Sequence, residues 1–119
     1  MVNRGLKRDI PVHWLSKEAR FRIIDVLLST RTVKNLAEEL KISRAAIRKY
    51  VSRETHPSDD IMARIFEIIA PYEEDRLARI VVDDLVEAIK RLNNSLEREE
   101  HKSYLMNKLK EVLKELEGR

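Results

Sequence analysis

Residues that make tight turns are scarce in this chain, whose 119 residues include only two glycines and three prolines. A β-rich domain of this length needs more of them, because the connections between strands depend on turn residues. Long segments instead repeat apolar residues every three or four positions, which is the spacing of one face of a helix. The sequence therefore predicts an all-α protein.

Composition excludes several other classes of protein. Cysteine is absent, which excludes disulfides, thiol nucleophiles and cysteine-based metal sites. No apolar run approaches the roughly 18 residues of a membrane span, and no apolar stretch of a signal peptide follows the N-terminus, so we expect a cytoplasmic protein. Glutamine is also absent while Glu, Lys and Arg abound, as is typical of proteins from thermophiles.

Charge is unevenly divided along the sequence. Residues 1–56 carry 13 basic and 6 acidic residues, whereas residues 57–119 carry 11 and 15. A basic first half suits a polyanion and an acidic second half suits another protein. An uneven but merely solvated surface is the alternative.

Four short helices are expected between residues 16 and 70. The fourth should end near Pro71, and Trp14 is expected to anchor the segment before the first helix. Each helix follows a hydroxyl side chain that can cap its N-terminus, namely Ser16, Thr32, Ser43 and Ser58.

Two longer amphipathic segments, at residues 77–96 and 105–116, follow this region. A polar stretch at 97–103 separates them, so we expect two helices in a hairpin, with one long helix as the alternative. Their apolar stripe is predicted to form a dimer interface, and the alternative is that it folds back onto the first domain and completes a single core. Its residues are Leu77, Val81, Leu85, Ala88, Leu92, Leu105, Leu109, Val112 and Leu116.

The segment 33–52, VKNLAEELKISRAAIRKYVS, fits a helix-turn-helix. Ala37 occupies the crossing of the two helices, where only a small side chain fits, and a wedge of apolar residues separates them. This wedge consists of Leu36, Leu40, Ile42, Ile47 and Tyr50.

The second helix of this motif is basic on its solvent side. No acidic residue interrupts residues 41–53. Such a helix suits the phosphate-lined major groove, where arginine also recognises guanine. The solvent side carries Arg44, Ala45, Arg48 and Lys49, with Lys41 before it and Arg53 after it.

Residues 16–70 resemble the lambda-repressor-like (Cro and XRE type) DNA-binding domain. That family typically has Ser-Arg-x-x-Ile in the recognition helix, then a loop ending in Pro-Ser and a further helix with two spaced apolar residues. The matching residues here are Ser43, Arg44, Ile47, Pro57, Ser58, Ile61 and Ile65.

The resemblance implies a recognition helix in the major groove, usually in a dimer on a palindromic site. It also implies that Lys34 contacts phosphate. Two positions depart from the family. Lys41 replaces a turn glycine and would adopt positive φ at a cost of about 1 kcal/mol. Arg53 replaces the glycine that often ends the recognition helix, so we expect a longer helix.

No enzyme, metal site or cofactor is predicted. The three histidines, at positions 13, 56 and 101, lie far apart, and two glycines cannot build a phosphate-binding loop. Asp59 and Asp60 are expected to favour the dipole at a helix start, and Asp83 and Asp84 to lie on the rim of their helix.

The sequence thus predicts three parts: a basic arm (1–15), a helix-turn-helix domain (16–70) and a dimerisation region (71–119). The favoured hypothesis is a homodimeric, sequence-specific double-stranded DNA-binding protein that regulates transcription. The predicted contacts are Lys34, Lys41, Ser43, Arg44, Ala45, Arg48, Lys49 and Arg53. In the arm, Arg4, Lys7 and Arg8 either enter the minor groove or remain solvated. The alternative is a scaffold, antitoxin-like or DNA-maintenance protein whose C-terminal helices bind a different protein.

Overall fold

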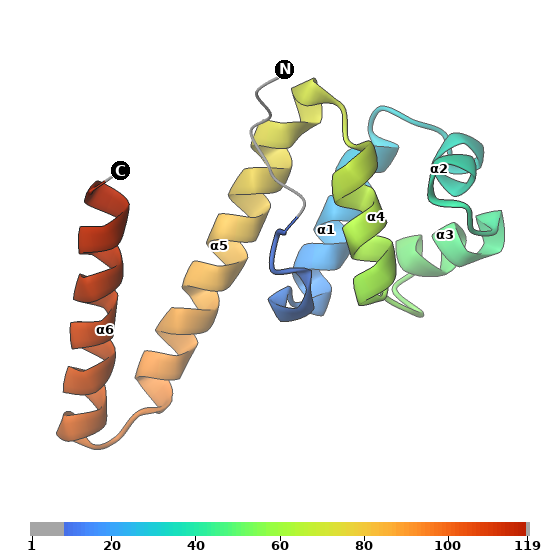
Figure 1. The fold of residues 1–119 in the computed structure, drawn as a ribbon. Coiled ribbons are helices and arrows are strands. Elements are labelled where there is room, and N and C mark those ends of the chain that lie inside the picture. Colours follow the sequence, from blue (N-terminus) through green and yellow to red (C-terminus); the bar gives the residue numbers. More distant parts are fainter. Residues whose placement is uncertain (1–8, 119) are drawn as a thin grey trace. The chain divides into compact units, whose positions relative to one another are not determined.

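The computed structural model describes residues 9–118, which form helices and contain no strand (Figure 1). The prediction of an all-α protein is confirmed. Of the two alternatives for the C-terminal segment, two helices are present. The elements are η1 (Val12–Trp14), α1 (Lys17–Leu28), α2 (Val33–Leu40), α3 (Arg44–Val51), α4 (Asp59–Ile68), α5 (Pro71–Ser95) and α6 (Glu99–Glu117).

The helix starts follow the predicted capping residues. Each side-chain oxygen accepts a hydrogen bond from the backbone N–H three residues later, over distances between 3.0 and 3.3 Å. These bonds satisfy backbone donors that a helix leaves unpaired at its first turn. The four confirmed caps are Ser16, Thr32, Ser43 and Ser58.

A non-glycine residue with left-handed backbone lies just past the end of α2 and of α3. Lys41 has φ 58° and Arg53 has φ 66°. The N–H of the next residue donates to the carbonyl five positions back, at 3.0 Å after α2 and 2.9 Å after α3, which is a Schellman cap. Positive φ at Lys41 is confirmed. The expectation of a longer α3 is wrong, because Arg53 itself adopts the conformation that ends the helix.

The chain divides into two compact units, Met1–Leu85 and Val86–Arg119, called here the N-terminal and C-terminal units. Helix α5 contributes residues 71–85 to the first and 86–95 to the second. The sequence predicted this boundary at residue 70, whereas the structure places it between residues 85 and 86.

The core of the N-terminal unit includes the first part of α5. Leu77 is 0% exposed, and Ile80 and Val81 are buried in the same cluster as residues from α1 to α4. Leu77 and Val81 therefore lack surface to offer a second chain, and their assignment to a dimer interface is corrected. The other fully buried apolar side chains are Ile23, Ile24, Leu27, Leu36, Leu40, Ile47, Met62 and Ile65.

Glu73 fastens the start of α5 to the turn between α1 and α2. Its side chain is 2% exposed and accepts hydrogen bonds from Arg31 Nη1 at 2.5 Å, Arg31 Nη2 at 2.9 Å and Thr30 Oγ1 at 3.0 Å. It also accepts one from Ala70 N at 2.9 Å, as the glutamate of a capping box does. Burial alone would raise the pKa of Glu73, but these bonds outweigh it and hold the pKa below its ordinary value.

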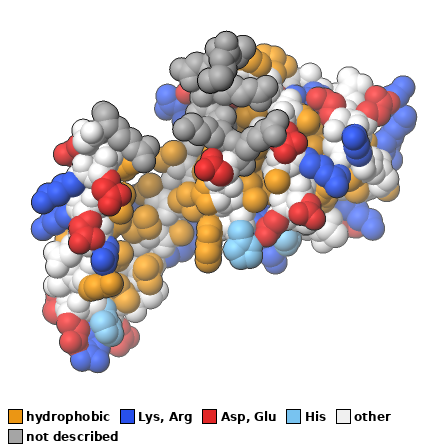
Figure 2. Space-filling view, viewed as in Figure 1, with side chains coloured by type: hydrophobic (Ala, Val, Ile, Leu, Met, Phe, Trp, Pro, Cys, Tyr) orange, Lys and Arg blue, Asp and Glu red, His pale blue; other side chains and the backbone are white. Residues whose placement is uncertain are grey.

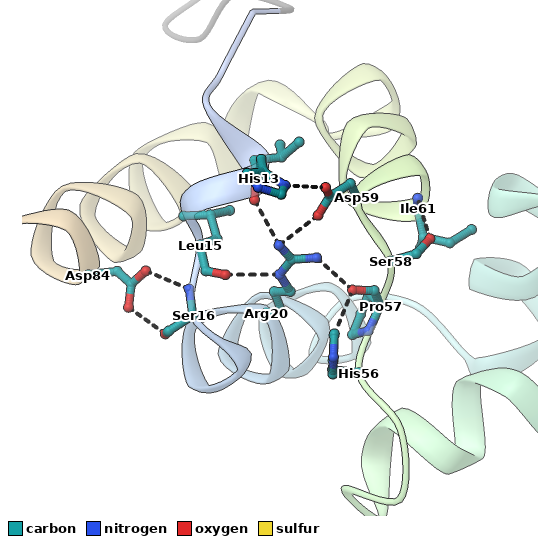
Figure 3. Close-up of polar contacts among 11 residues, drawn as sticks. His13, Leu15, Ser16, Arg20, His56, Pro57, Ser58, Asp59, Ile61 and Asp84 are labelled. Atoms are coloured by element: carbon teal, nitrogen blue, oxygen red, sulfur yellow. Dashed lines mark hydrogen bonds and ion pairs between the residues drawn. The ribbon is translucent and has the colours of Figure 1, made fainter. Parts of the chain in front are cut away.

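Arg20 ties η1 and α4 to α1 (Figure 3). Its guanidinium is buried and donates to Asp59 Oδ1 at 2.8 Å and to three backbone carbonyls, those of Val12, Leu15 and Pro57. Asp59 also accepts a bond from His13 Nδ1 at 2.7 Å, and the bonds from His13 and Arg20 lower the pKa of Asp59. This carboxylate therefore does more than favour a helix dipole.

The start of α1 is attached differently from the prediction. Trp14 is 72% exposed rather than anchored, and Leu15 is the buried residue there. Asp84, expected on a rim, is half-buried and accepts hydrogen bonds from Ser16 N at 2.9 Å and Ser16 Oγ at 2.5 Å (Figure 3). These bonds hold α5 against the first turn of α1.

The C-terminal unit buries none of its described residues, 86–118. Leu105 and Leu109 are half-buried, and Figure 2 shows hydrophobic side chains on the surface of this unit. None of the described helices is long and apolar enough to cross a membrane. The exposed large apolar residues of this unit are Val86, Ile89, Leu92, Tyr104, Met106, Val112, Leu113 and Leu116.

Candidate nucleic-acid interface

Helix α3 buries one side and exposes the other. Ile47 and Tyr50 are buried in the N-terminal unit. Since 3.6 residues make one turn, the residues on the opposite side form a single face. This face consists of Arg44, Ala45, Arg48 and Lys49, all of which are exposed.

Helix α2 supports α3 through a short turn at residues 41–43. Leu36 and Leu40 are fully buried in the same core as Ile47, and Ala37 is buried beside them. Ser43, predicted to bind DNA, is exposed and accepts a hydrogen bond from Ala46 N at 3.0 Å. Its hydroxyl proton remains available to donate.

The cations of the α3 face have no partner in the part of the chain that the structure describes. Within residues 9–118, Arg44, Arg48 and Lys49 make no ion pair and no side-chain hydrogen bond. By contrast, Arg20 and Arg31 of the same unit bind carboxylates. Because the charges on α3 are not neutralised within the described chain, they can interact with an anion outside it.

Arg53, which is predicted to contact DNA, lies just after α3 and binds a carboxylate. Its Nη2 donates to Asp25 Oδ2 at 3.0 Å, and its guanidinium lies 4.7 Å from the centre of the Phe21 ring. The hydrogen bond to Asp25 raises the pKa of Arg53. This contact holds the end of α3 against α1, so Arg53 differs from the other basic residues of α3 in having a carboxylate partner.

Lys34 and Lys41 flank the face. Lys34 is exposed in the first turn of α2 and has no ion pair among the described residues. Lys41 lies at the edge of a surface depression of about 400 Å³ whose lining includes Glu39 and Glu67. Its surroundings are therefore of mixed charge, unlike those of the α3 face. Figure 2 shows Lys and Arg side chains where α2 and α3 lie.

The structure does not gather all the predicted site residues. Arg4, Lys7 and Arg8 lie outside the described residues. Of the predicted interface, Leu85 is half-buried against the N-terminal core. Leu105 and Leu109 are half-buried in the C-terminal unit, and the remaining members, Ala88, Leu92, Val112 and Leu116, are exposed.

Two residues that position this site were missed by the sequence analysis. Arg31 and Glu73 join the turn before α2 to α5. The spacing of Ala70 and Glu73 is that of a capping box, but its first residue lacks the hydroxyl that makes the pattern recognisable.

The histidines and carboxylates do not converge on a metal site in the described part of the chain. His13 bonds to Asp59, and His56 Nδ1 donates to the carbonyl of Pro57 at 3.1 Å. Comparison with protein-family models, curated proteins and solved structures found no match to the chain.

Proposed function

We propose that this chain binds double-stranded DNA in a sequence-specific manner, with α2 and α3 acting as a helix-turn-helix and α3 in the major groove. The observation that carries the proposal is the exposed face of α3, which has no acidic residue and three cations without a partner among residues 9–118. Regulation of transcription is the biological role that such binding supports best.

The placement of the cations supports this proposal over a merely solvated basic surface. An exposed helix that serves only solubility usually mixes its charges, as α2 does with Lys34, Glu38 and Glu39. On α3 the basic residues are concentrated on one face of a helix with firmly held ends. Ser43 caps its start, and Arg53, which lies two residues after its end, is held by a hydrogen bond to Asp25.

Binding to a random-sequence duplex pool tests the proposal directly. We expect selection to enrich a defined site, and expect Lys34→Ala to weaken binding to all duplexes. Loss of one phosphate contact should reduce the slope of log affinity against log salt by about 0.9.

Lys110→Ala is the matched control, because Lys110 is exposed on α6 and has no ion pair among the described residues. It removes the same charge and should leave the salt slope unchanged. Absence of binding to any duplex, or an equal effect of both variants, would contradict DNA binding by this face.

A homodimer formed through the C-terminal unit is the second part of the proposal. Residues 86–118, which comprise the second part of α5 and the described part of the chain after it, include no buried residue. They leave much apolar surface in water, which favours burial against a partner. Residues 86–118 carry seven basic and seven acidic residues, so a second copy meets no net repulsion. Two recognition helices on neighbouring half-sites would also strengthen binding.

Molecular mass in solution, measured over a range of concentrations, tests the dimer. We expect Val112→Asp to dissociate it, because Val112 is exposed on the apolar side of α6. Asn107→Asp, which adds the same charge at another exposed position of α6, should not. A monomer at every concentration would contradict the homodimer and favour a different protein as the partner of these helices.

A further inference from the structure

The side chains on the α3 face limit which base pairs it can recognise. Arginine pairs with guanine through two hydrogen bonds, asparagine and glutamine pair with adenine, and alanine contacts the methyl group of thymine. The chain has no glutamine, and the described part of the N-terminal unit has one asparagine, Asn35, which lies on α2. The face of α3 therefore lacks an amide for adenine.

Ala45 lies at the centre of the exposed face. It stands opposite the buried side made by Ile47 and Tyr50, and Arg48 and Lys49 flank it. A methyl group at this position allows the helix backbone to approach the base edges closely. It also provides the apolar contact that the C5-methyl of thymine accepts.

The spacing of the two arginines sets the spacing of their targets. Arg44 and Arg48 are four residues apart, which is about 6 Å along a helix that rises 1.5 Å per residue. Stacked bases are 3.4 Å apart along a strand, so the two guanidinium groups are matched to bases about two steps apart. Neither arginine is held by a protein carboxylate in the described chain, so both guanidinium groups are available to bind a base.

We infer that each half-site contains two G·C pairs separated by one T·A pair, with Arg44 and Arg48 on the guanines and Ala45 on the thymine methyl. This inference rests on the proposed function. Lys49 is assigned to the phosphate backbone, because its ammonium group is a point charge without the planar pair of donors that arginine has.

Selection from a random duplex pool should enrich guanines two steps apart. In the enriched duplex, replacing one guanine by 7-deazaguanine removes the N7 acceptor and keeps O6, so it should weaken binding by about 2- to 12-fold, which is half the free energy of one arginine–guanine pair. Replacing the thymine by uracil removes only the methyl group and should cause a smaller loss.

Arg48→Lys and Lys49→Arg form a matched pair that preserves charge. Arg48→Lys replaces a planar pair of donors by a single point charge and should reduce discrimination against 7-deazaguanine at one position, so that the protein and DNA changes are not additive. Lys49→Arg should leave discrimination intact. Circular dichroism and melting temperature check folding, which neither exposed substitution should alter.

The outcomes separate this inference from the proposed function. If duplexes bind and a site is enriched without paired guanines, or if Arg48→Lys and 7-deazaguanine act additively, the assignment of bases is wrong while DNA binding stands. If no duplex binds, the proposed function fails as well.

Discussion

Leu77 and Leu92 lie on the same helix, α5, yet Leu77 is 0% exposed in the N-terminal unit and Leu92 is 50% exposed in the C-terminal unit. The ion pairs of the two units also differ in their exposure to water. Glu73 and Arg31 are shielded from water in the first unit, whereas Lys108 and Glu111 pair at 3.3 Å on the surface of the second. The N-terminal unit thus has a closed core, which includes the buried side of α3. The C-terminal unit instead leaves most of its apolar side chains exposed.

The largest difference between the units is expected when an ion pair is broken. Glu73→Ala should lower the free energy of unfolding by about 3–5 kcal/mol, because it leaves Arg31 without its main partner at a shielded site. Glu111→Ala should have little effect, since exposed ion pairs contribute little. Urea unfolding of both variants provides the measurement, and equal losses would contradict the difference between the units.

A second comparison makes the same substitution at two positions of α5. Leu77→Ala should cost about 2–5 kcal/mol, because it opens a cavity in a closed core. At a concentration where the chain is monomeric, Leu92→Ala should cost less than about 1 kcal/mol. Thermal unfolding at low protein concentration would show the difference. A comparable loss from Leu92→Ala would mean that the C-terminal unit has a core of its own.

Acid should weaken the N-terminal unit through Glu73. The pKa of Glu73 is lower in the folded chain than in the unfolded one, where it is about 4.3. Its contribution is therefore fully present well above pH 4.3 and is lost as pH falls through the folded pKa. Urea unfolding at a series of pH values should show a smaller loss of stability below pH 4.3 in Glu73→Gln than in the unaltered chain. Parallel pH profiles would contradict this role.

The smallest expected effect is a gain in stability from substitutions at the ends of α2 and α3. Lys41→Gly should stabilise the chain by about 1 kcal/mol, because glycine adopts positive φ without strain. Arg53→Gly should gain less, since it also removes the contacts with Asp25 and Phe21. Melting temperatures of the two variants test this order, and a larger gain for Arg53→Gly would show that its contacts contribute nothing.

Sequence patterns predicted the features that depend on neighbouring residues. The cap by Ser43 could be predicted because its hydrogen bond reaches only three residues along the chain. The positive φ of Lys41 could be predicted because the turn after α2 requires it. The side of α3 that faces outward also followed from its apolar spacing. These features need no knowledge of distant segments.

Features that depend on distant segments could not be predicted in this way. Periodicity identified Leu77 and Leu92 as members of one stripe, but it cannot say which neighbour covers each of them. The contact of Arg53 with Asp25 joins residues 28 positions apart, so no local sequence pattern identifies Asp25 as its partner.

The exposure of Trp14 has a practical consequence for spectroscopy. It is the single tryptophan of the chain, and its ring stands edge-on to that of His13, with 5.1 Å between centroids. Since this indole already faces water, its emission will change little on unfolding and is a poor optical reporter of denaturation. A ligand or partner that covers Trp14 would instead shift the emission to shorter wavelength, so the native chain carries a label-free probe of binding at this end of α1.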